Sequence, residues 1–286
     1  MAPTITTHLS SLTRPELSRR KTHHYLTICH LYPDLMDTYG DMGNIITIRK
    51  RCEWRGIKTT ITNVSVNDSL ATYDFDFYFF GGGQDKAQEI VAKDLFNIAQ
   101  PLRKSINKGA VLLSICGGYQ LLQNYFKTKD GKKLEGLGIF DAHTIGSDDR
   151  MIQNLLIELN HDLKSAVSNI YSTNLQAHKP TSPQTYLIGF ENHSGKTYLG
   201  KNVKPLGTVI KGAGNNGQDK TEGAIYKNAF GCYIHGSLLP KNPHFADYLI
   251  TKALERQYGI VKLKPLDDSI EWQAHKQAIG RSFKSS

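Results

Sequence analysis

Short strand-like segments alternate with longer amphipathic segments in the first part of the chain. Four segments have the length and composition of strands: Tyr25–Leu31, Lys58–Val64, Phe75–Phe80 and Ala110–Ile115. Between them, Ile45, Ile48 and Cys52 share one stripe of a helix, and another helix is expected from Asp85 to Asn107. Apolar strands that alternate with helices belong to parallel sheets covered on both faces. The pattern therefore predicts an α/β fold in which a mostly parallel sheet is flanked by helices, a three-layer sandwich.

The second half of the chain has a weaker pattern. The polar stretch Asn160–Gln184, which contains Pro180 and Pro183, predicts a long loop or insertion. Strands are expected at three further places: Thr185–Phe190, Gly223–Tyr226 and Phe230–Ile234. A last clear helix begins with Asn242 as its N-cap and Pro243 at its first position.

These segments indicate one domain over residues 25–262 with additions at both ends. Residues 1–24 are rich in Ser, Thr and Arg and lack hydrophobic periodicity, which predicts a disordered extension; a transit peptide is the alternative. Residues 263–286 are expected to form a tail that could include a short helix. The sequence has neither a run of eighteen apolar residues nor a secretory signal, so the cytoplasm is the expected location.

Composition and charge narrow the class of protein. Of 286 residues 39% are hydrophobic and 21% charged, which is typical of a globular protein. The four cysteines form no C-x-x-C pair and no disulfide framework, so each is available for packing or chemistry in a reducing compartment. The net charge of +9 fits an anionic substrate or surface. The sequence has no dense basic stripe with stacking aromatic residues, which nucleic-acid binding would need.

A cysteine stands where a predicted buried strand meets a helix. The strand Ala110–Ile115 is followed by Cys116, Gly117 and Gly118, and the glycines permit a sharp turn. This is the nucleophile-elbow arrangement with cysteine in place of serine. A thiol at a helix N-terminus is favoured as the reactive thiolate. The alternative is a buried cysteine that packs as a small hydrophobic residue beside a tight turn.

Two further strand ends supply groups that such a nucleophile requires. The strand Phe75–Phe80 ends in three glycines, and we expect the backbone N–H groups of Gly82 and Gly117 to form an oxyanion hole. His235 directly follows an apolar strand and is the candidate base. Cys232 lies three residues before His235, on the opposite face of a strand, so a shared metal is not expected.

Two glycine-rich stretches resemble nucleotide-binding motifs only superficially. Gly212–Gly217 fits G-x-G-x-x-G, but no helix signal follows it, so we interpret it as a loop. Gly189–Thr197 has five residues between its glycines where a P-loop has four, and Glu191 would repel phosphate. The chain is therefore not expected to bind ATP itself.

With Cys116, the triple-glycine turn and His235 in place, the chain resembles the class I glutamine amidotransferases, and more narrowly their cobyric-acid-synthase-like branch. Cys116-Gly-Gly-Tyr-Gln120 matches the C-x-G-x-Q form of that class, which implies that Gln120 helps to hold the substrate glutamine. Six motifs between Tyr25 and Ile260 further resemble the amidotransferase subunits of lipid II isoglutaminyl synthases: Tyr39-Gly-Asp-Met-Gly-Asn44-Ile, Gly81-Gly-Gly-Gln-Asp85, Leu134-Glu-Gly-Leu-Gly138, Arg150-Met-Ile, Gly189-Phe-Glu-Asn-His193 and His235-Gly-Ser-Leu-Leu-Pro-Lys-Asn242.

The resemblance implies a flavodoxin-like amidotransferase fold and a cytoplasmic enzyme of bacterial cell-wall synthesis. Such an enzyme hydrolyses L-glutamine and passes ammonia to a MurT-like Mur ligase. That partner uses ATP and Mg²⁺ to amidate the α-carboxylate of D-glutamate in lipid II at the inner face of the membrane, so no cofactor or metal is expected in this chain. The substrate-binding arginine of the family falls on Arg150.

One departure from the class concerns the residue that orients the histidine. Most class I enzymes carry H-x-E, but Ser237 stands where the glutamate would be, so we expect a Cys–His dyad with Glu191 as the candidate orienting carboxylate. Three alternatives stay open at this point. They are a cobyric-acid-type amidotransferase that feeds another synthetase, a non-catalytic regulatory module and a cysteine peptidase of similar fold.

Overall fold

The computed structural model describes residues 24–70, 73–172 and 183–284, so nearly all of the predicted N-terminal extension lies outside the described residues. A six-stranded sheet in the order β11-β12-β4-β3-β1-β2 forms the centre. Its strands are β1 (Tyr25–Leu31), β2 (Lys58–Val64), β3 (Phe77–Phe80), β4 (Val111–Ile115), β11 (Ala224–Tyr226) and β12 (Ala229–Cys232). Every neighbouring pair is parallel except β11 with β12. The predicted fold class is confirmed.

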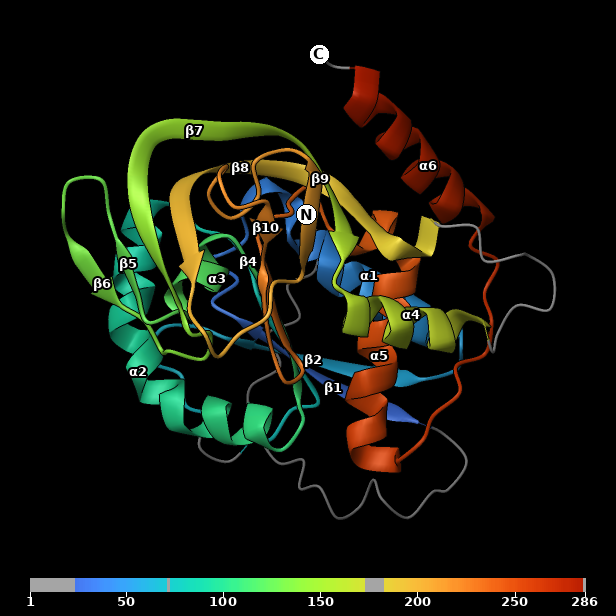
Figure 1. The fold of residues 1–286 in the computed structure, drawn as a ribbon. Coiled ribbons are helices and arrows are strands. Elements are labelled where there is room, and N and C mark those ends of the chain that lie inside the picture. Colours follow the sequence, from blue (N-terminus) through green and yellow to red (C-terminus); the bar gives the residue numbers. More distant parts are fainter. Residues whose placement is uncertain (1–23, 71–72, 173–182, 285–286) are drawn as a thin grey trace, which may run out of the picture.

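Helices cover both faces of this sheet (Figure 1). Helices α1 (Met42–Glu53) and α5 (Pro243–Tyr258) pack together on one face. Helix α2 (Asp85–Asn107) and the short α3 (Gly117–Leu121) contact each other on the opposite face. A stripe of α2 is buried because its apolar residues recur at helical spacing. No helix in the described part of the chain has the length and apolar content needed to cross a bilayer.

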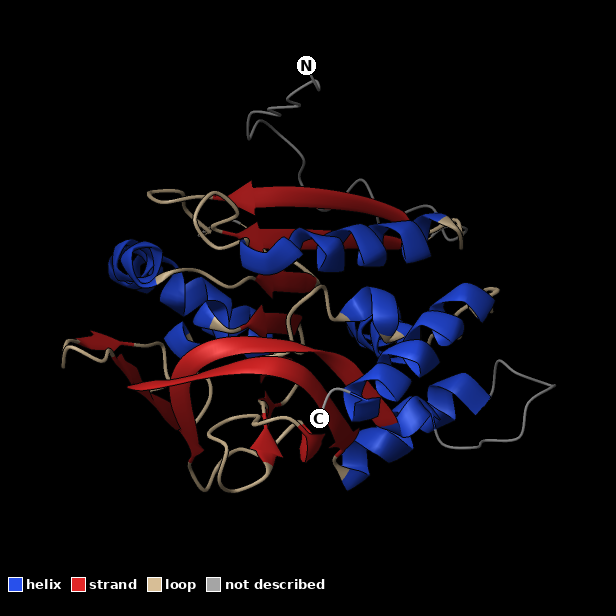
Figure 2. Cartoon of the chain, turned by 90° about the horizontal axis from the view of Figure 1, so that it is seen from above, coloured by secondary structure: helices blue, strands red, loops and turns tan. Residues whose placement is uncertain are grey.

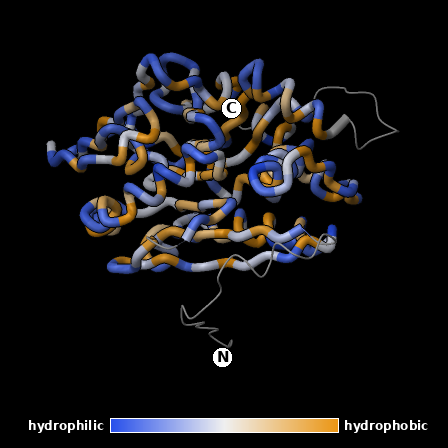
Figure 3. The backbone as a smooth tube through the Cα atoms, turned by 90° about the horizontal axis from the view of Figure 1, so that it is seen from below, coloured by the Kyte–Doolittle hydropathy of each residue, from blue (hydrophilic) through white to orange (hydrophobic). Residues whose placement is uncertain are grey.

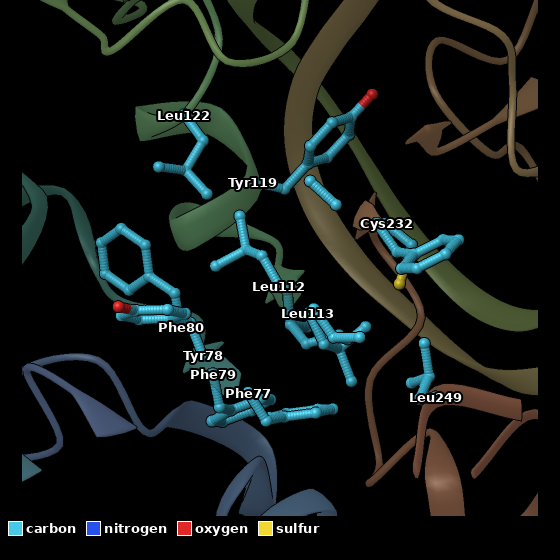
Figure 4. Close-up of a cluster of buried hydrophobic side chains, with 14 of the residues drawn as sticks. Phe77, Tyr78, Phe79, Phe80, Leu112, Leu113, Tyr119, Leu122, Cys232 and Leu249 are labelled. Carbon is cyan, nitrogen blue, oxygen red and sulfur yellow. The ribbon is translucent and has the colours of Figure 1, made fainter. Parts of the chain in front are cut away.

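The core lies between the sheet and these helices. Strand β3 buries all of its residues, as expected for a central parallel strand that is covered on both faces. Figure 4 shows their aromatic side chains together with Leu112 and Leu113 of the neighbouring β4. Apolar residues are concentrated along the inner strands and polar ones along the outer turns (Figure 3).

A second sheet, which the sequence predicted only in part, packs beside the first. The long strands β7 (Ala142–Leu159) and β8 (Tyr186–Leu199) pair antiparallel and curve across the molecule (Figure 2). The shorter strands of this sheet are β5 (Tyr125–Lys127), β6 (Lys133–Glu135), β9 (Gly207–Lys211) and β10 (Thr221–Glu222). A pair of backbone hydrogen bonds between Phe190 of β8 and His235, 2.6 and 3.2 Å long, joins this sheet to the segment that follows β12.

Two segments are more helical than the sequence predicted. The polar stretch 160–184 was expected to be a loop, but its first half forms helix α4 (His161–Ser172), with Leu163 and Val167 buried. Residues 173–182 of that stretch lie outside the described residues. The C-terminal tail, which was expected to hold at most a short helix, contains the 16-residue α6 (Ser269–Lys284). In α4 the buried Leu163 and Val167 and the partly buried Ile170 recur at helical spacing, but the polar residues and prolines of the surrounding stretch outweigh this signal.

The C-terminal segment is held to the domain by a buried ion cluster. The guanidinium of Arg51 in α1 donates to both carboxylate oxygens of Asp247 and of Asp268, at 2.6 to 2.9 Å. Helix α6 then packs next to the 3₁₀ turn η4 (Leu239–Lys241), where the carbonyl of Lys241 lies 2.8 Å from Nδ1 of His275. Removing one partner of such a buried ion cluster leaves an uncompensated charge and strongly destabilises the fold. The cluster therefore anchors the start of the C-terminal segment, at Asp268, to helix α1.

Candidate active site

Cys116 lies at the sharp turn that the sequence predicted. It is the N-cap of α3, directly after β4, and its backbone has φ 48° and ψ −106°. A non-glycine residue in this region is strained, and such strain persists only where the surrounding structure holds it. Here the Cys116 N–H donates to the carbonyl of Cys232 at 2.8 Å, which ties the elbow to the end of β12. The side chain is 9% exposed.

The glycine-rich turn after β3 packs directly against this elbow. A Cβ at Gly118 would lie 2.6 Å from the Phe80 carbonyl oxygen and 2.8 Å from that of Gly81, so only glycine allows α3 to approach the turn. The Gly118 N–H donates to the carbonyl oxygen of Gly81 at 3.1 Å. The two βα turns are therefore in contact, as expected for adjacent parallel strands that end at the same edge.

The expected pair of oxyanion donors is only partly free. The N–H of Gly82 donates to Oδ2 of Asp41 at 2.8 Å and is thus already engaged. The neighbouring N–H of Gly83 has no hydrogen bond to any described residue. Its nitrogen would lie 2.9 Å from a Cβ at Gly117, which places it beside the elbow. The amide of Gly83, which the sequence analysis did not select, is therefore better placed than that of Gly82 to meet a ligand at Cys116.

His235 reaches the same edge of the sheet from β12 and is fully buried. Its Nδ1 lies 3.3 Å from Oδ1 of Asp41, and its Nε2 has no hydrogen-bond partner among the described residues. The ring also fits against the glycine-rich turn, since a Cβ at Gly82 would lie 2.8 Å from its Cε1. Asp41 thus contacts both the histidine and the turn.

The electrostatics of His235 favour the charged imidazolium. Burial by itself lowers its pKa, but negative charge on Cys116 and the Asp41 carboxylate outweigh burial and raise the pKa to about 10. A buried imidazole keeps its proton in this way only when anionic groups lie next to it. Cys116 and His235, which the sequence placed on separate strand ends, are therefore electrostatic neighbours.

The carboxylate beside His235 is Asp41, not Glu191. Both oxygens of the buried Glu191 accept backbone N–H groups, from Ala213 at 2.6 Å and from Gly214 at 2.8 Å. Sequence reasoning missed Asp41, although it lies in one of the motifs that carried the resemblance. A signal was available, since Asp41 follows β1 and the carboxyl ends of parallel strands converge.

The two residues expected to bind substrate have different surroundings. Gln120 is buried, and its amide donates to the hydroxyl of Tyr233 at 3.1 Å. Arg150 is exposed on β7, where its Nε donates to Asn192 at 2.9 Å and its Nη2 to the hydroxyl of Tyr39 at 3.3 Å. The Tyr39 ring in turn packs edge-on against His235, with the ring centroids 4.9 Å apart. Arg150 is therefore one side chain away from the candidate base.

The two stretches that resemble nucleotide-binding motifs have other structures. Gly189–Thr197 lies within the continuous strand β8, and the turn at Gly212–Gly217 receives the carboxylate of Glu191 through its backbone N–H groups. Neither forms the strand–loop–helix unit that cradles phosphate. Within residues 24–70, 73–172 and 183–284, no group of three or more His, Cys, Asp or Glu side chains is arranged to hold a metal ion.

Comparison with known proteins gives a consistent match. Residues 27–243 match the model of the CobB/CobQ-like glutamine amidotransferase domain. A Staphylococcus aureus (strain N315) protein named lipid II isoglutaminyl synthase (glutamine-hydrolyzing) subunit GatD is 38% identical over 259 residues, which cover 91% of this chain and 97% of that protein. The protein of the same name from Streptococcus pneumoniae (strain ATCC BAA-255 / R6) is 39% identical over 234 residues, covering 82% of each chain.

Cobyric acid synthases match over less of their length. The probable cobyric acid synthase of Methanocaldococcus jannaschii is 28% identical over 214 residues, which cover 70% of this chain but 38% of that protein. The region shared with this longer protein is thus only a part of it.

Proposed function

Because the chain belongs to the family of CobB/CobQ-like glutamine amidotransferases, we propose that it is the glutamine-hydrolysing subunit of a lipid II isoglutaminyl synthase. The near full-length similarity to the two GatD proteins carries this assignment, since the cobyric acid synthase shares only 38% of its own length. The contact between His235 and Asp41, and the charge on Cys116 that raises the pKa of His235, support the chemistry.

The reaction begins with attack of the Cys116 thiolate on the δ-carbonyl carbon of L-glutamine. A C–S bond forms and the carbonyl becomes a tetrahedral oxyanion, and we assign its stabilisation to the N–H groups of Gly117 and Gly83, the latter of which lies beside the elbow. His235 gives its proton to the amide nitrogen and the C–N bond breaks. Ammonia departs, and a γ-glutamyl thioester remains on Cys116. Water, deprotonated by His235, then cleaves the C–S bond and releases glutamate.

Asp41 has a supporting role in this mechanism. Its Oδ1 faces Nδ1 of His235 and so holds the ring with Nε2 toward the reacting atoms. Its other oxygen accepts the N–H of Gly82, which fixes the glycine-rich turn beside the elbow. Cys116, His235 and Asp41 thus act as a triad rather than the dyad expected from the sequence.

The ammonia is consumed by a second subunit. We assign this subunit to the Mur-ligase-like class, related to MurT, which activates the α-carboxylate of D-glutamate in lipid II with ATP and Mg²⁺. We assign the ATP-dependent activation step to that partner. The enzyme then works in the cytoplasm and meets the membrane through its partner and substrate.

The first test replaces the nucleophile. Cys116→Ser should lower glutamate release from L-glutamine by at least about 10³-fold and prevent covalent trapping by a reactive glutamine analogue. Cys52→Ala, which alters a buried cysteine in α1 away from the elbow, is the matched control and should keep activity. Unchanged activity of the Cys116 variant would refute the mechanism, and peptide cleavage without glutamine turnover would favour a peptidase.

The second test concerns the partner. Co-purification of the full chain from its source should recover a Mur-ligase-like subunit, and the complex should release glutamate faster than the chain alone because the partner completes or gates the site. Recovery of a cobyrinate-type synthetase would instead assign the chain to cofactor synthesis. Equal rates with and without the partner would contradict gating.

A further inference from the structure

Tyr39 lies over the candidate base in a backbone conformation that its neighbours enforce. Its φ of 57° is in the left-handed region, which non-glycine residues adopt at a cost. The loop is held on one side by the Thr38 N–H, which donates to the Gly82 carbonyl at 3.1 Å. On the other side the Ser237 hydroxyl donates to the Gly40 carbonyl at 2.5 Å. These bonds fix Tyr39 between the glycine-rich turn and the segment that follows His235.

The Tyr39 side chain connects two parts of the site. Its ring packs against His235 with centroids 4.9 Å apart and planes inclined at 73°, while its hydroxyl accepts a hydrogen bond from Nη2 of Arg150. Tyr39 is 50% exposed, whereas His235 beneath its ring is fully buried. No other described side chain contacts both Arg150 and His235 through hydrogen bonds or ring packing.

The hydrogen bonds of Arg150 leave one edge of its guanidinium open. Nε donates to Asn192 and Nη2 to Tyr39, and these two nitrogens share one side of the planar fork. Nη1 has no hydrogen bond to a described residue, so the edge formed by Nη1 and the second proton of Nη2 is available. A fork oriented in this way matches the two oxygens of a carboxylate.

We propose that Tyr39 is a positioning residue, whose hydroxyl orients Arg150 toward the α-carboxylate of glutamine and whose ring seats the imidazole of His235. This inference rests on the proposed glutaminase function and adds a residue to it. Tyr39 takes no proton and forms no bond to the substrate. It links recognition at the α-carboxylate end of glutamine to the group that serves the δ-amide end.

The test separates the hydroxyl of Tyr39 from its ring. Tyr39→Phe keeps the ring, so KM for L-glutamine should rise about threefold to tenfold, the loss expected for one hydrogen bond, with kcat and the pH profile unchanged. L-Glutaminamide, in which a carboxamide replaces the α-carboxylate, should show no change in KM. Tyr39→Leu removes the ring as well, so kcat should also fall about tenfold or more because the base is less well placed.

Two further variants control the experiment. Asn192→Ala removes the other hydrogen bond of the Arg150 fork and should reproduce the selective rise in KM for L-glutamine. Tyr226→Phe, at the end of β11, alters a tyrosine outside the site and should change nothing.

The possible results can be told apart. If Tyr39→Phe leaves both KM values unchanged, or raises both equally, the inference is wrong while the glutaminase assignment stands. If the wild-type chain releases no glutamate from glutamine, alone or with its partner, the proposed function fails instead.

Discussion

The proposed reacting groups and Arg150, the proposed substrate-binding residue, reach the site in different ways. Asp41, the glycine-rich turn, Cys116 and His235 follow β1, β3, β4 and β12, which are four consecutive strands of the central sheet. Arg150 comes from β7 of the second sheet, at a point where the pairing register with β8 shifts between Gly146 and Met151. In the proposed function, chemistry therefore resides at the edge of the central sheet, whereas recognition depends on how the second sheet is attached to it.

Among the variants that test this comparison, the largest effect is expected from removing the charge beside His235. Asp41→Asn should lower kcat about 10²- to 10⁴-fold, because the histidine loses both its orientation and its stabilised charge. In the proposed mechanism His235 must be protonated to release ammonia, so wild-type activity should fall as pH rises through its pKa of about 10. Without the Asp41 carboxylate that pKa is lower, and the loss should begin at lower pH. Steady-state rates across pH measure both effects.

Glu191→Gln is the matched control for this prediction. Glu191 is also a buried carboxylate, but it binds the backbone of Ala213 and Gly214, so its loss should reduce stability and leave the alkaline limit of activity in place. If Glu191→Gln moved that limit and Asp41→Asn did not, the assignment of the orienting carboxylate would be reversed.

A smaller effect is expected at the recognition side. Arg150→Ala should raise KM for L-glutamine roughly 10- to 100-fold, the loss expected for hydrogen bonds to a charged group, with kcat changed little. Arg150→Lys keeps the positive charge but lacks the planar guanidinium fork, so its KM for L-glutamine should lie between those of the wild type and of Arg150→Ala. Arg103→Ala, on an exposed position of α2, is the control for loss of a surface arginine. A fall in kcat without a change in KM would place Arg150 in the chemistry instead.

The last prediction concerns Glu222, a residue where the two sheets meet, and its expected effect is on stability more than on catalysis. Glu222 of β10 is fully buried, and its Oε1 accepts the N–H of Tyr233 at 2.6 Å. Burial raises its pKa to about 8, with the Glu191 charge contributing. Since the folded chain then binds a proton that the unfolded chain releases, the stability that this group contributes is complete below its ordinary pKa of 4.5 and is lost as pH rises toward 8.

Glu222→Gln tests this assignment because glutamine stays neutral at every pH. Urea unfolding at pH 5 and pH 8 should show that the wild type loses stability on the order of a few kcal/mol more than the variant does. Equal losses in the two proteins would show that Glu222 does not titrate in this range.

Much of the central sheet could be predicted from the sequence. The strands Tyr25–Leu31 and Lys58–Val64 and the helix Asp85–Asn107 have the predicted bounds, because each has a periodicity that its own residues determine. The second sheet could not be assembled in this way. Residues Gly146–Arg150 interrupt the alternation of β7 with polar side chains, and the strand is recognisable mainly through its pairing with β8.

The sequence by itself determined the candidate nucleophile and base, because Cys116 and His235 each directly follow an apolar strand and a strand end is a local feature. Only the tertiary structure decided which carboxylate faces His235, which glycine N–H lies open beside Cys116, and which tyrosine joins Arg150 to the site. Those pairings depend on the order of strands in the sheet and on the contact between two sheets. Both are set by interactions between residues far apart in the chain, which no local pattern of side chains records.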